Sequence, residues 1–221
     1  MPERRLLDST QLFAALPETV LDELRSRAET RTLERGDLLF EQGDASAELF
    51  VVREGKLAIA TKSTDGRESL VAVMEPGGLF GELGLFDDGP RSADARALTE
   101  AQVLALDYEH VRAVLRAQPQ LLWVVVRLLA VRLRATDEAL ADAVFLDVPA
   151  RTAKRLLEQA GESDQVVLPM TQEDLAGLVG ASRERVNKAL ALFVKLGWIE
   201  ATGRGRYRIL DREQLDLRAN P

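Results

Sequence analysis

The chain reads GELGLFDDGPRSA over residues 81–93, and this stretch brings together the groups that a sugar phosphate needs. Its glycines let backbone N–H groups approach an anion closely. Arg91 supplies a planar guanidinium that matches two phosphate oxygens. An ionised Glu82 can only accept hydrogen bonds and therefore suits a ribose hydroxyl better than a phosphate. We predict a ribose-phosphate site formed by Gly81, Glu82, Leu83, Arg91 and Ser92. A surface loop with a Glu82–Arg91 ion pair is the alternative interpretation.

Short strands separated by glycine turns are expected on either side of this stretch, over residues 30–107. Apolar and β-branched runs recur between evenly spaced glycines, as at residues 49–52, and Asp65-Gly66 is a two-residue hairpin signal. Two further strands are expected at residues 93–98 and 102–106. This pattern is typical of a small antiparallel barrel or jelly roll, which the 81–93 stretch interrupts before its last strands.

A long helix is expected over residues 120–145, after helical segments at residues 9–28 and 108–117. Its inward positions alternate by four and three residues, with one threonine among them: Leu122, Val126, Leu129, Leu133, Thr136, Leu140 and Ala143. This heptad seam predicts a coiled-coil partner, and a symmetric homodimer is the simplest one. A core helix buried against the barrel is the alternative, and the apolar stripe is broad enough for both.

Residues 171–190 show a helix, a glycine turn and a capped helix in close succession, which is typical of a helix-turn-helix. Gly180 ends the first helix, Ser182 caps the second, and residues 197–209 add a β-hairpin wing. Arginine can donate a bidentate pair to guanine, and glutamate can accept from the cytosine amino group. A solvated, charged helix face is the alternative interpretation.

The predicted DNA contacts fall into three groups. The base contacts are Arg183, Glu184 and Lys188; the phosphate contacts are Arg185, Arg204 and Arg206; Thr171, Ser182 and Asn187 complete the set.

Composition narrows the class of protein. The 221-residue chain has no cysteine and one histidine, which excludes disulfides, thiolate nucleophiles and cysteine-held clusters, and we expect no metal site. The formal net charge of −7 argues against indiscriminate nucleic-acid binding, yet residues 181–210 hold seven basic and two acidic side chains. A local basic patch on an acidic protein fits selective contact with double-stranded DNA. The chain shows no export signal, and Arg127 and Arg132 interrupt its most apolar segment, so we expect a cytoplasmic protein without a membrane partner.

Three motifs together resemble the cyclic-AMP receptor protein and FNR family of bacterial transcription regulators. They are the Gly-Glu and Arg-Ser pairs of residues 81–92, the hinge-like Phe145-Leu146-Asp147-Val148, and the helix-turn-helix. The resemblance implies an α+β fold with an N-terminal cyclic-nucleotide-binding β jelly roll (residues 1–118), a dimerisation helix (119–146) and a C-terminal winged helix-turn-helix (147–221). It also implies cyclic AMP as the allosteric ligand, a palindromic TGTGA-like DNA site and RNA polymerase as a partner.

The resemblance extends to single residues, with two departures. In the resembling receptor a threonine at the place of Thr136 contacts the adenine, and the next residue reaches the base bound by the other subunit. Arg183 and Glu184 stand where the receptor contacts its TGTGA-like half-sites. Asp137 replaces the receptor's serine and Lys188 its arginine. A carboxylate at position 137 could accept from the adenine amino group, but it would repel additional phosphates.

These observations predict a cyclic-AMP-responsive homodimeric transcription regulator that is not an enzyme. Asp137 keeps open an alternative in which the same DNA-binding domain acts constitutively or responds to another ligand, such as a cyclic dinucleotide. A phosphoester-cleaving enzyme that pairs Glu82 with Asp87 or Asp88 is disfavoured by the single histidine and the lack of a metal-ligand cluster in the sequence.

Overall fold

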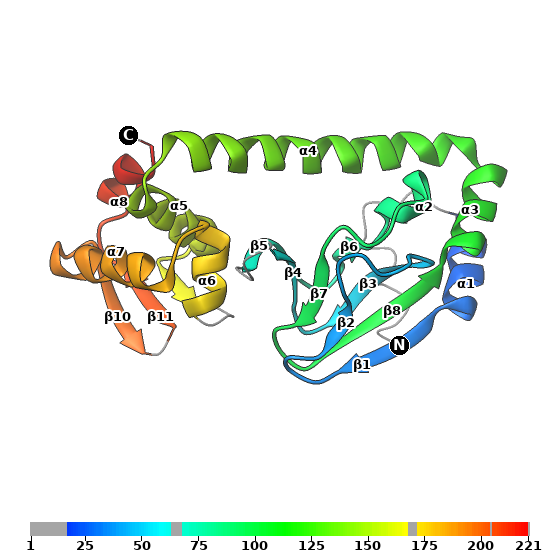
Figure 1. Cartoon of the computed structure of the whole chain (residues 1–221), viewed down its shortest axis with the longest axis horizontal. Coiled ribbons are helices and arrows are strands. Elements are labelled where there is room, and N and C mark those ends of the chain that lie inside the picture. Colours follow the sequence, from blue (N-terminus) through cyan, green and yellow to red (C-terminus); the bar gives the residue numbers. More distant parts are fainter. Residues whose placement is uncertain (1–16, 63–67, 168–171, 204, 221) are drawn as a thin grey trace. The chain divides into compact units, whose positions relative to one another are not determined.

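The structure, a computed structural model, describes residues 17–62, 68–167, 172–203 and 205–220 (Figure 1). The chain divides into two compact units, residues 1–134 and 135–221, with the boundary inside the long helix α4 (Leu122–Phe145). The predicted α+β class is confirmed. The helical segment expected at residues 9–16, the Asp65-Gly66 turn, Thr171 and Arg204 lie outside the described residues.

The first unit contains two four-stranded antiparallel sheets among its described residues. The first sheet, in the order β1-β8-β3-β6, comprises β1 (Glu29–Leu33), β3 (Glu48–Glu54), β6 (Leu79–Phe80) and β8 (Ala101–Asp107). The second, in the order β2-β7-β4-β5, comprises β2 (Leu38–Phe40), β4 (Leu57–Lys62), β5 (Glu68–Met74) and β7 (Asp94–Ala97). This arrangement confirms the jelly roll. The short helix α2 (Leu83–Asp87) lies between β6 and β7 in the chain, within the 81–93 stretch.

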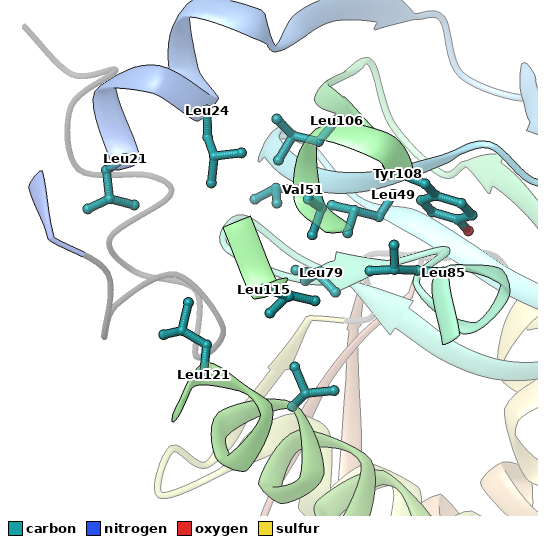
Figure 2. Packing of buried hydrophobic residues seen from close by; sticks show 12 residues of the cluster. Leu21, Leu24, Leu49, Val51, Leu79, Leu85, Leu106, Tyr108, Leu115 and Leu121 are labelled. Atoms are coloured by element: carbon teal, nitrogen blue, oxygen red, sulfur yellow. The ribbon is translucent and has the colours of Figure 1, made fainter. Parts of the chain in front are cut away.

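Strand β3 separates two apolar cores, because its successive side chains point to opposite faces. Leu49 and Val51 pack with α1 (Glu18–Arg27) and α3 (Tyr108–Ala117), for example against Leu24 (Figure 2). Phe50 and Val52 pack between the two sheets. Each of these four β3 side chains is at most 1% exposed, so the strand is buried on both faces.

Helix α4 covers one of these cores with its first turns, where Val125 is buried. Of the predicted heptad seam, Leu129 packs against this core, whereas Val126, Leu133 and Leu140 are 54%, 62% and 64% exposed. The helix therefore has a core face and, beside it, exposed apolar side chains at three seam positions. No single helix in the described ranges is long and apolar enough to cross a membrane; only α3 and Pro119–Phe145 together, bent by 108°, reach that length and composition.

The second unit contains the predicted winged helix-turn-helix. Helices α6 (Gln172–Val179) and α7 (Arg183–Lys195) flank a turn in which Gly180 adopts a φ of +66°. The wing is the hairpin of β10 (Ile199–Gly203) and β11 (Arg206–Ile209), and α5 (Val148–Ala160) precedes the motif.

Two elements of this unit go beyond the sequence-based expectation. Strand β9 (Gln165–Val167) extends the wing to the order β10-β11-β9, and α8 (Arg212–Ala219) packs against α5. Strand β9 is too short to show a period. Helix α8 buries only Leu215 and Ala219, which is too few apolar positions for a helical pattern.

Asp94 is a buried carboxylate that joins separate parts of the jelly roll. It accepts a hydrogen bond from the backbone N–H of Gln42 at 2.7 Å and pairs with Lys62 of β4 at 2.6 Å. Burial alone would raise the pKa of Asp94, but the hydrogen bonds from Lys62 and Gln42 outweigh it and hold the pKa below its ordinary value. The ionised carboxylate therefore stabilises the fold at neutral pH.

The variant Asp94→Asn is expected to lose about 1–3 kcal/mol of unfolding free energy at neutral pH, because the buried site loses a charge-assisted pair. The loss is fully present above the ordinary aspartate pKa of about 4, and it shrinks as the pH falls toward the lowered native pKa. Urea unfolding across that range measures it. Glu75→Gln, which removes an exposed pair with Lys56, is the control and should change stability by less than about 1 kcal/mol. A loss for Asp94→Asn that does not vary with pH would contradict the assignment.

Candidate ligand-binding site and DNA-contacting surface

Arg91 is the buried cation of the predicted phosphate site and is 6% exposed. Its Cζ lies 4.2 Å from the ring centroid of Phe40 and 5.2 Å from that of Phe50. Nη1 donates to the Gly81 carbonyl at 2.9 Å, and Nε is buried without a hydrogen-bond partner. Burial lowers the pKa of Arg91, as expected for an incompletely compensated charge. Within the described ranges Arg91 forms no ion pair, so no carboxylate neutralises it.

Glu82 lies beside this cation but pairs with Arg132 of α4, not with Arg91. The Glu82 side chain is 2% exposed, and Arg132 also donates to the carbonyl of Leu79. The ion pair of the surface-loop interpretation is therefore replaced by one that ties the 81–93 stretch to the long helix. Sequence reasoning missed Arg132, which is 50 residues from Glu82. Its one signal is its spacing of seven residues from the buried Val125, which places a cation on the core face of α4.

The glycines of the 81–93 stretch are needed for close approach. A Cβ at Gly81, where φ is +72°, would lie 2.7 Å from Nη1 of Arg91. A Cβ at Gly84 would lie 2.8 Å from the Gly89 carbonyl oxygen and 2.9 Å from Cβ of Ser46, and closer still to the Ser46 hydroxyl. That hydroxyl donates to the Gly89 carbonyl at 2.6 Å. Helix α2 is thus packed directly onto the loop that leads to Arg91.

The variant Gly84→Ala is expected to lower the free energy of unfolding by about 1–3 kcal/mol, because the added methyl group meets backbone that cannot move aside. It should also weaken ligand binding, since the loop before Arg91 must shift. Urea unfolding and calorimetric titration with cyclic AMP measure the two effects. Gly203→Ala is the matched control, because among the described residues its Cβ would meet Arg206 side-chain atoms at 3.7 Å and 3.9 Å, which is ordinary contact. Equal stability of the two variants would show that the space around Gly84 can relax.

Helix α3 contacts the chain just before α2 and the carboxyl-terminal part of α2, contacts that sequence reasoning did not predict. The Tyr108 hydroxyl donates to the Gly81 carbonyl and accepts from Nη1 of Arg91 at 3.4 Å. Burial raises the pKa of Tyr108, so the phenol stays protonated and able to donate. One turn later Arg112 donates to the Leu85 carbonyl at 3.2 Å and 3.3 Å and pairs with Asp88. A cation near the carboxyl end of a helix interacts favourably with the terminal carbonyl groups, which lack partners within the helix.

The remaining predicted ligand residues are placed as follows. Leu83 opens α2 and is exposed, and Ser92, next to Arg91, is exposed as well. Thr136 and Asp137 are exposed on the part of α4 that belongs to the second unit. Contact of these two residues with a ligand in the first unit stays a prediction.

The three carboxylates of the enzyme alternative already have partners. Asp87 accepts from the Gly89 N–H at 2.8 Å, Asp88 pairs with Arg112, and Glu82 pairs with Arg132. Asp87 and Asp88 are exposed, whereas Glu82 is buried. The three side chains therefore occupy different environments and do not form a carboxylate pair.

Helix α7 presents a charged face and buries the opposite one. Its capping residue Ser182 accepts from the Arg185 N–H at 3.4 Å. The buried face contributes Val186, Ala189, Leu190 and Phe193 to the second unit's core. The predicted contact residues Ser182, Arg183, Glu184, Arg185 and Lys188 are exposed, Asn187 is half-buried, and Arg206 is exposed at the start of β11.

Two of the predicted base-contacting residues pair with each other. Lys188 Nζ lies 2.7 Å from a Glu184 carboxylate oxygen, one helical turn away, and both side chains are 75% exposed. The hydrogen bond from Lys188 lowers the pKa of Glu184. Glu184 is therefore ionised and turned along the helix toward Lys188, and it can only accept.

Two family models match the chain, one over the candidate ligand-binding site and one over the candidate DNA-contacting surface. A cyclic nucleotide-binding domain matches residues 30–118, which contain the jelly roll and Arg91. A Crp-like helix-turn-helix domain matches residues 150–218, which contain α6, α7 and the wing.

Three similar proteins show the relationship. The "CRP-like cAMP-activated global transcriptional regulator" of Mycobacterium tuberculosis is 38% identical over 221 residues, with 97% of this chain and 98% of its own covered. The catabolite activator protein of Thermus thermophilus is 32% identical, with a TM-score of 0.55 over 95% of this chain and 98% of its own. The c-di-GMP-responsive regulator CLP of Xanthomonas campestris has a TM-score of 0.76 over 87% and 99%, and at 23% identity it shows the fold alone. The chain therefore belongs to the cyclic-AMP receptor protein and FNR family of transcription regulators.

Proposed function

We propose that this regulator is a homodimer that binds cyclic AMP in each jelly roll and, in response, binds a palindromic DNA site. The observation that carries the nucleotide part is Arg91, a buried guanidinium that no carboxylate neutralises within the described ranges. A phosphodiester offers one negative charge and two free oxygens to such a fork. Its binding would offset the cost of burying the cation.

The other members of the proposed nucleotide site are Gly81, Glu82, Leu83, Ser92, Thr136 and Asp137. Glu82, held by Arg132, would accept from a ribose hydroxyl. Thr136 and Asp137 would meet the base, and the Asp137 carboxylate would accept from the adenine amino group. The name of the Mycobacterium tuberculosis relative, which calls that protein cAMP-activated, supports this ligand.

The exposed seam of α4 supports the homodimer. Val126, Leu133 and Leu140 are more than half exposed, and a second copy of the helix would cover all three in a coiled coil. We propose the division into residues 1–118 for the nucleotide, 119–146 for dimerisation and 147–221 for DNA binding.

Two α7 helices related by this dimer would enter successive major grooves of a TGTGA-like palindrome. Arg183, Glu184 and Lys188 would contact bases, and Arg185 and Arg206 would contact phosphates. Cyclic AMP would shift the dimer toward the DNA-binding arrangement, and DNA would tighten nucleotide binding by the same factor. RNA polymerase is the proposed partner on the promoter, and the cytoplasm the proposed location.

Fluorescence anisotropy tests the switch. The purified protein is titrated onto a TGTGA-N6-TCACA duplex with and without cyclic AMP at fixed salt, because phosphate contacts make the affinity salt-dependent. We expect cyclic AMP to strengthen binding at least about tenfold, which is about 1.4 kcal/mol of coupling. Arg183→Ala should no longer bind the palindromic duplex. Lys195→Ala should still bind it, because Lys195 is an exposed cation in the last turn of the same helix, away from the predicted base contacts. Tight DNA binding that is the same with and without cyclic AMP would contradict the proposed switch.

Asp137 favours a second candidate, in which the same DNA-binding domain acts constitutively or responds to a different ligand, such as a cyclic dinucleotide. Its carboxylate stands where the resembling receptor has a serine. Calorimetric titration with cyclic AMP, cyclic GMP and cyclic di-GMP separates the possibilities, and Asp137→Ser should favour cyclic AMP further. Prolonged incubation should leave cyclic AMP intact, because we propose a binding protein without catalysis.

A further inference from the structure

Arg151 joins two helix ends within the second unit. It lies in the first turns of α5, whose N-cap Asp147 accepts from the Ala150 N–H at 2.9 Å. The side chain is half-buried, and its guanidinium faces backbone carbonyls. The carbonyls at the end of a helix lack intrahelical partners and carry partial negative charge, so a cation is favoured there.

The first helix end is that of α4. Nη1 of Arg151 donates to the carbonyl of Leu146 at 2.6 Å and to that of Ala143 at 3.4 Å. Both carbonyls belong to the chain segment that leaves α4 and enters α5. Arg151 therefore links α5 to the carboxyl end of α4, and all of these residues lie within the second unit.

The second helix end is that of α6. Nε of Arg151 donates to the carbonyl of Val179 at 2.8 Å, and Nη2 donates to that of Gly180 at 3.4 Å. Gly180 forms the turn of the helix-turn-helix, and α7 begins three residues later. One planar side chain thus connects the end of α4 to the turn that sets the start of α7.

We propose that Arg151 is a positioning residue for DNA binding, whose guanidinium fixes the orientation of α7 relative to the carboxyl end of α4 within the second unit. The proposal rests on the DNA-binding function but not on the identity of the nucleotide. A fork with donors on three nitrogens can hold four carbonyls at two helix ends, which the single ammonium of lysine cannot match.

Two ion pairs lie near the same connection between α4 and α5. Arg218 of α8 pairs with Asp147, and Lys154 of α5 pairs with Asp142 of α4 at 2.6 Å. Each of these pairs fixes α5 against one other helix. Arg151 alone among these three cations also reaches the helix-turn-helix turn.

The experiment compares Arg151→Ala and Arg151→Lys with Arg155→Ala in the full-length protein. Arg155 is the matched control, because it lies one turn further along α5 and pairs with Glu158 of the same helix. The operator is selected by the unsubstituted protein from a random duplex pool, so the test assumes neither a sequence nor a nucleotide. For Arg151→Ala we expect operator affinity to fall at least about tenfold, because charge-assisted hydrogen bonds are lost. Affinity for non-specific DNA should stay within about twofold, because the exposed cations of α7 and the wing remain.

Hydrogen exchange supplies a second measurement. Amides in residues 142–147 and 176–182 should exchange faster in Arg151→Ala and not in Arg155→Ala, with Arg151→Lys intermediate in both exchange and affinity. Full operator affinity in Arg151→Ala, or an equal loss for specific and non-specific DNA, would overturn the positioning role.

The failure of the proposed switch is distinguishable from the failure of this inference. Operator binding that no nucleotide changes would contradict the proposed switch. The comparison of Arg151→Ala with Arg155→Ala would still test the positioning role. If the unsubstituted protein selects no sequence at all, the proposed function fails, and unchanged exchange in Arg151→Ala would by itself overturn the role of Arg151.

Discussion

Replacement of Arg91 by alanine is expected to weaken cyclic-AMP binding by about 100-fold or more, because two charge-assisted hydrogen bonds to the phosphate are lost in a buried site. The ligand-free fold should survive. Within the described ranges Arg91 has no carboxylate partner to leave stranded, and its truncation relieves the burial of a charge. Calorimetric titration measures the affinity, and thermal unfolding with and without cyclic AMP should show that the stabilisation by ligand disappears.

Two variants sharpen this experiment. Arg91→Lys keeps the charge without the planar fork, and we expect an affinity between those of the alanine variant and the unsubstituted protein. Arg96→Ala is the control, because Arg96 lies on β7 five residues further along and pairs with Glu68. An Arg91→Ala protein that binds cyclic AMP normally would remove the observation on which the proposed ligand rests.

Leu133→Glu is expected to convert the protein to a monomer and to weaken operator binding by about 100-fold or more, because the palindrome is then bound by one half at a time. Leu133 lies in the α4 seam and is 62% exposed within one chain. A second helix would bury it, and a carboxylate placed there would be desolvated without a partner. Light scattering after gel filtration measures the mass, and anisotropy measures the DNA affinity.

Val131→Glu makes the same charge change on the other side of α4. Val131 is 53% exposed, and residues two positions apart on a helix point to roughly opposite sides. We expect this variant to remain dimeric and to bind the operator. If both variants stay dimeric, the seam is not the dimer interface; if both become monomeric, added charge on α4 is the cause.

The local elements of this protein were predictable from the sequence because their causes are local. The boundaries Tyr108 to Ala117 of α3, the cap by Ser182 and the turn at Gly180 all follow from residues within one or two helical turns. The glycine-punctuated strands predicted the jelly roll for the same reason. Strand β9 and helix α8 were not predicted, because each has too few apolar positions to show a period.

The candidate sites were predictable as residue types but not as contacts. The sequence identified Arg91 and Glu82 as a cation and a carboxylate close together, and pairing them with each other was one interpretation. Tertiary packing instead stacks Arg91 on Phe40 and brings Arg132, 50 residues along the chain, to Glu82.

By itself the sequence determined the succession of folded elements, because caps, turns and periodic burial depend on residues close together in the chain. Its two kinds of binding motif also resembled those of the family to which the chain belongs. Only the tertiary structure decided which charges are compensated. In the folded chain Arg91 is buried without an ion pair among the described residues, and Glu82 pairs with Arg132 of the long helix. Arg151 donates hydrogen bonds to carbonyls at the ends of α4 and α6. Such contacts join residues far apart in the chain, and their partners are chosen by packing, which no local pattern encodes.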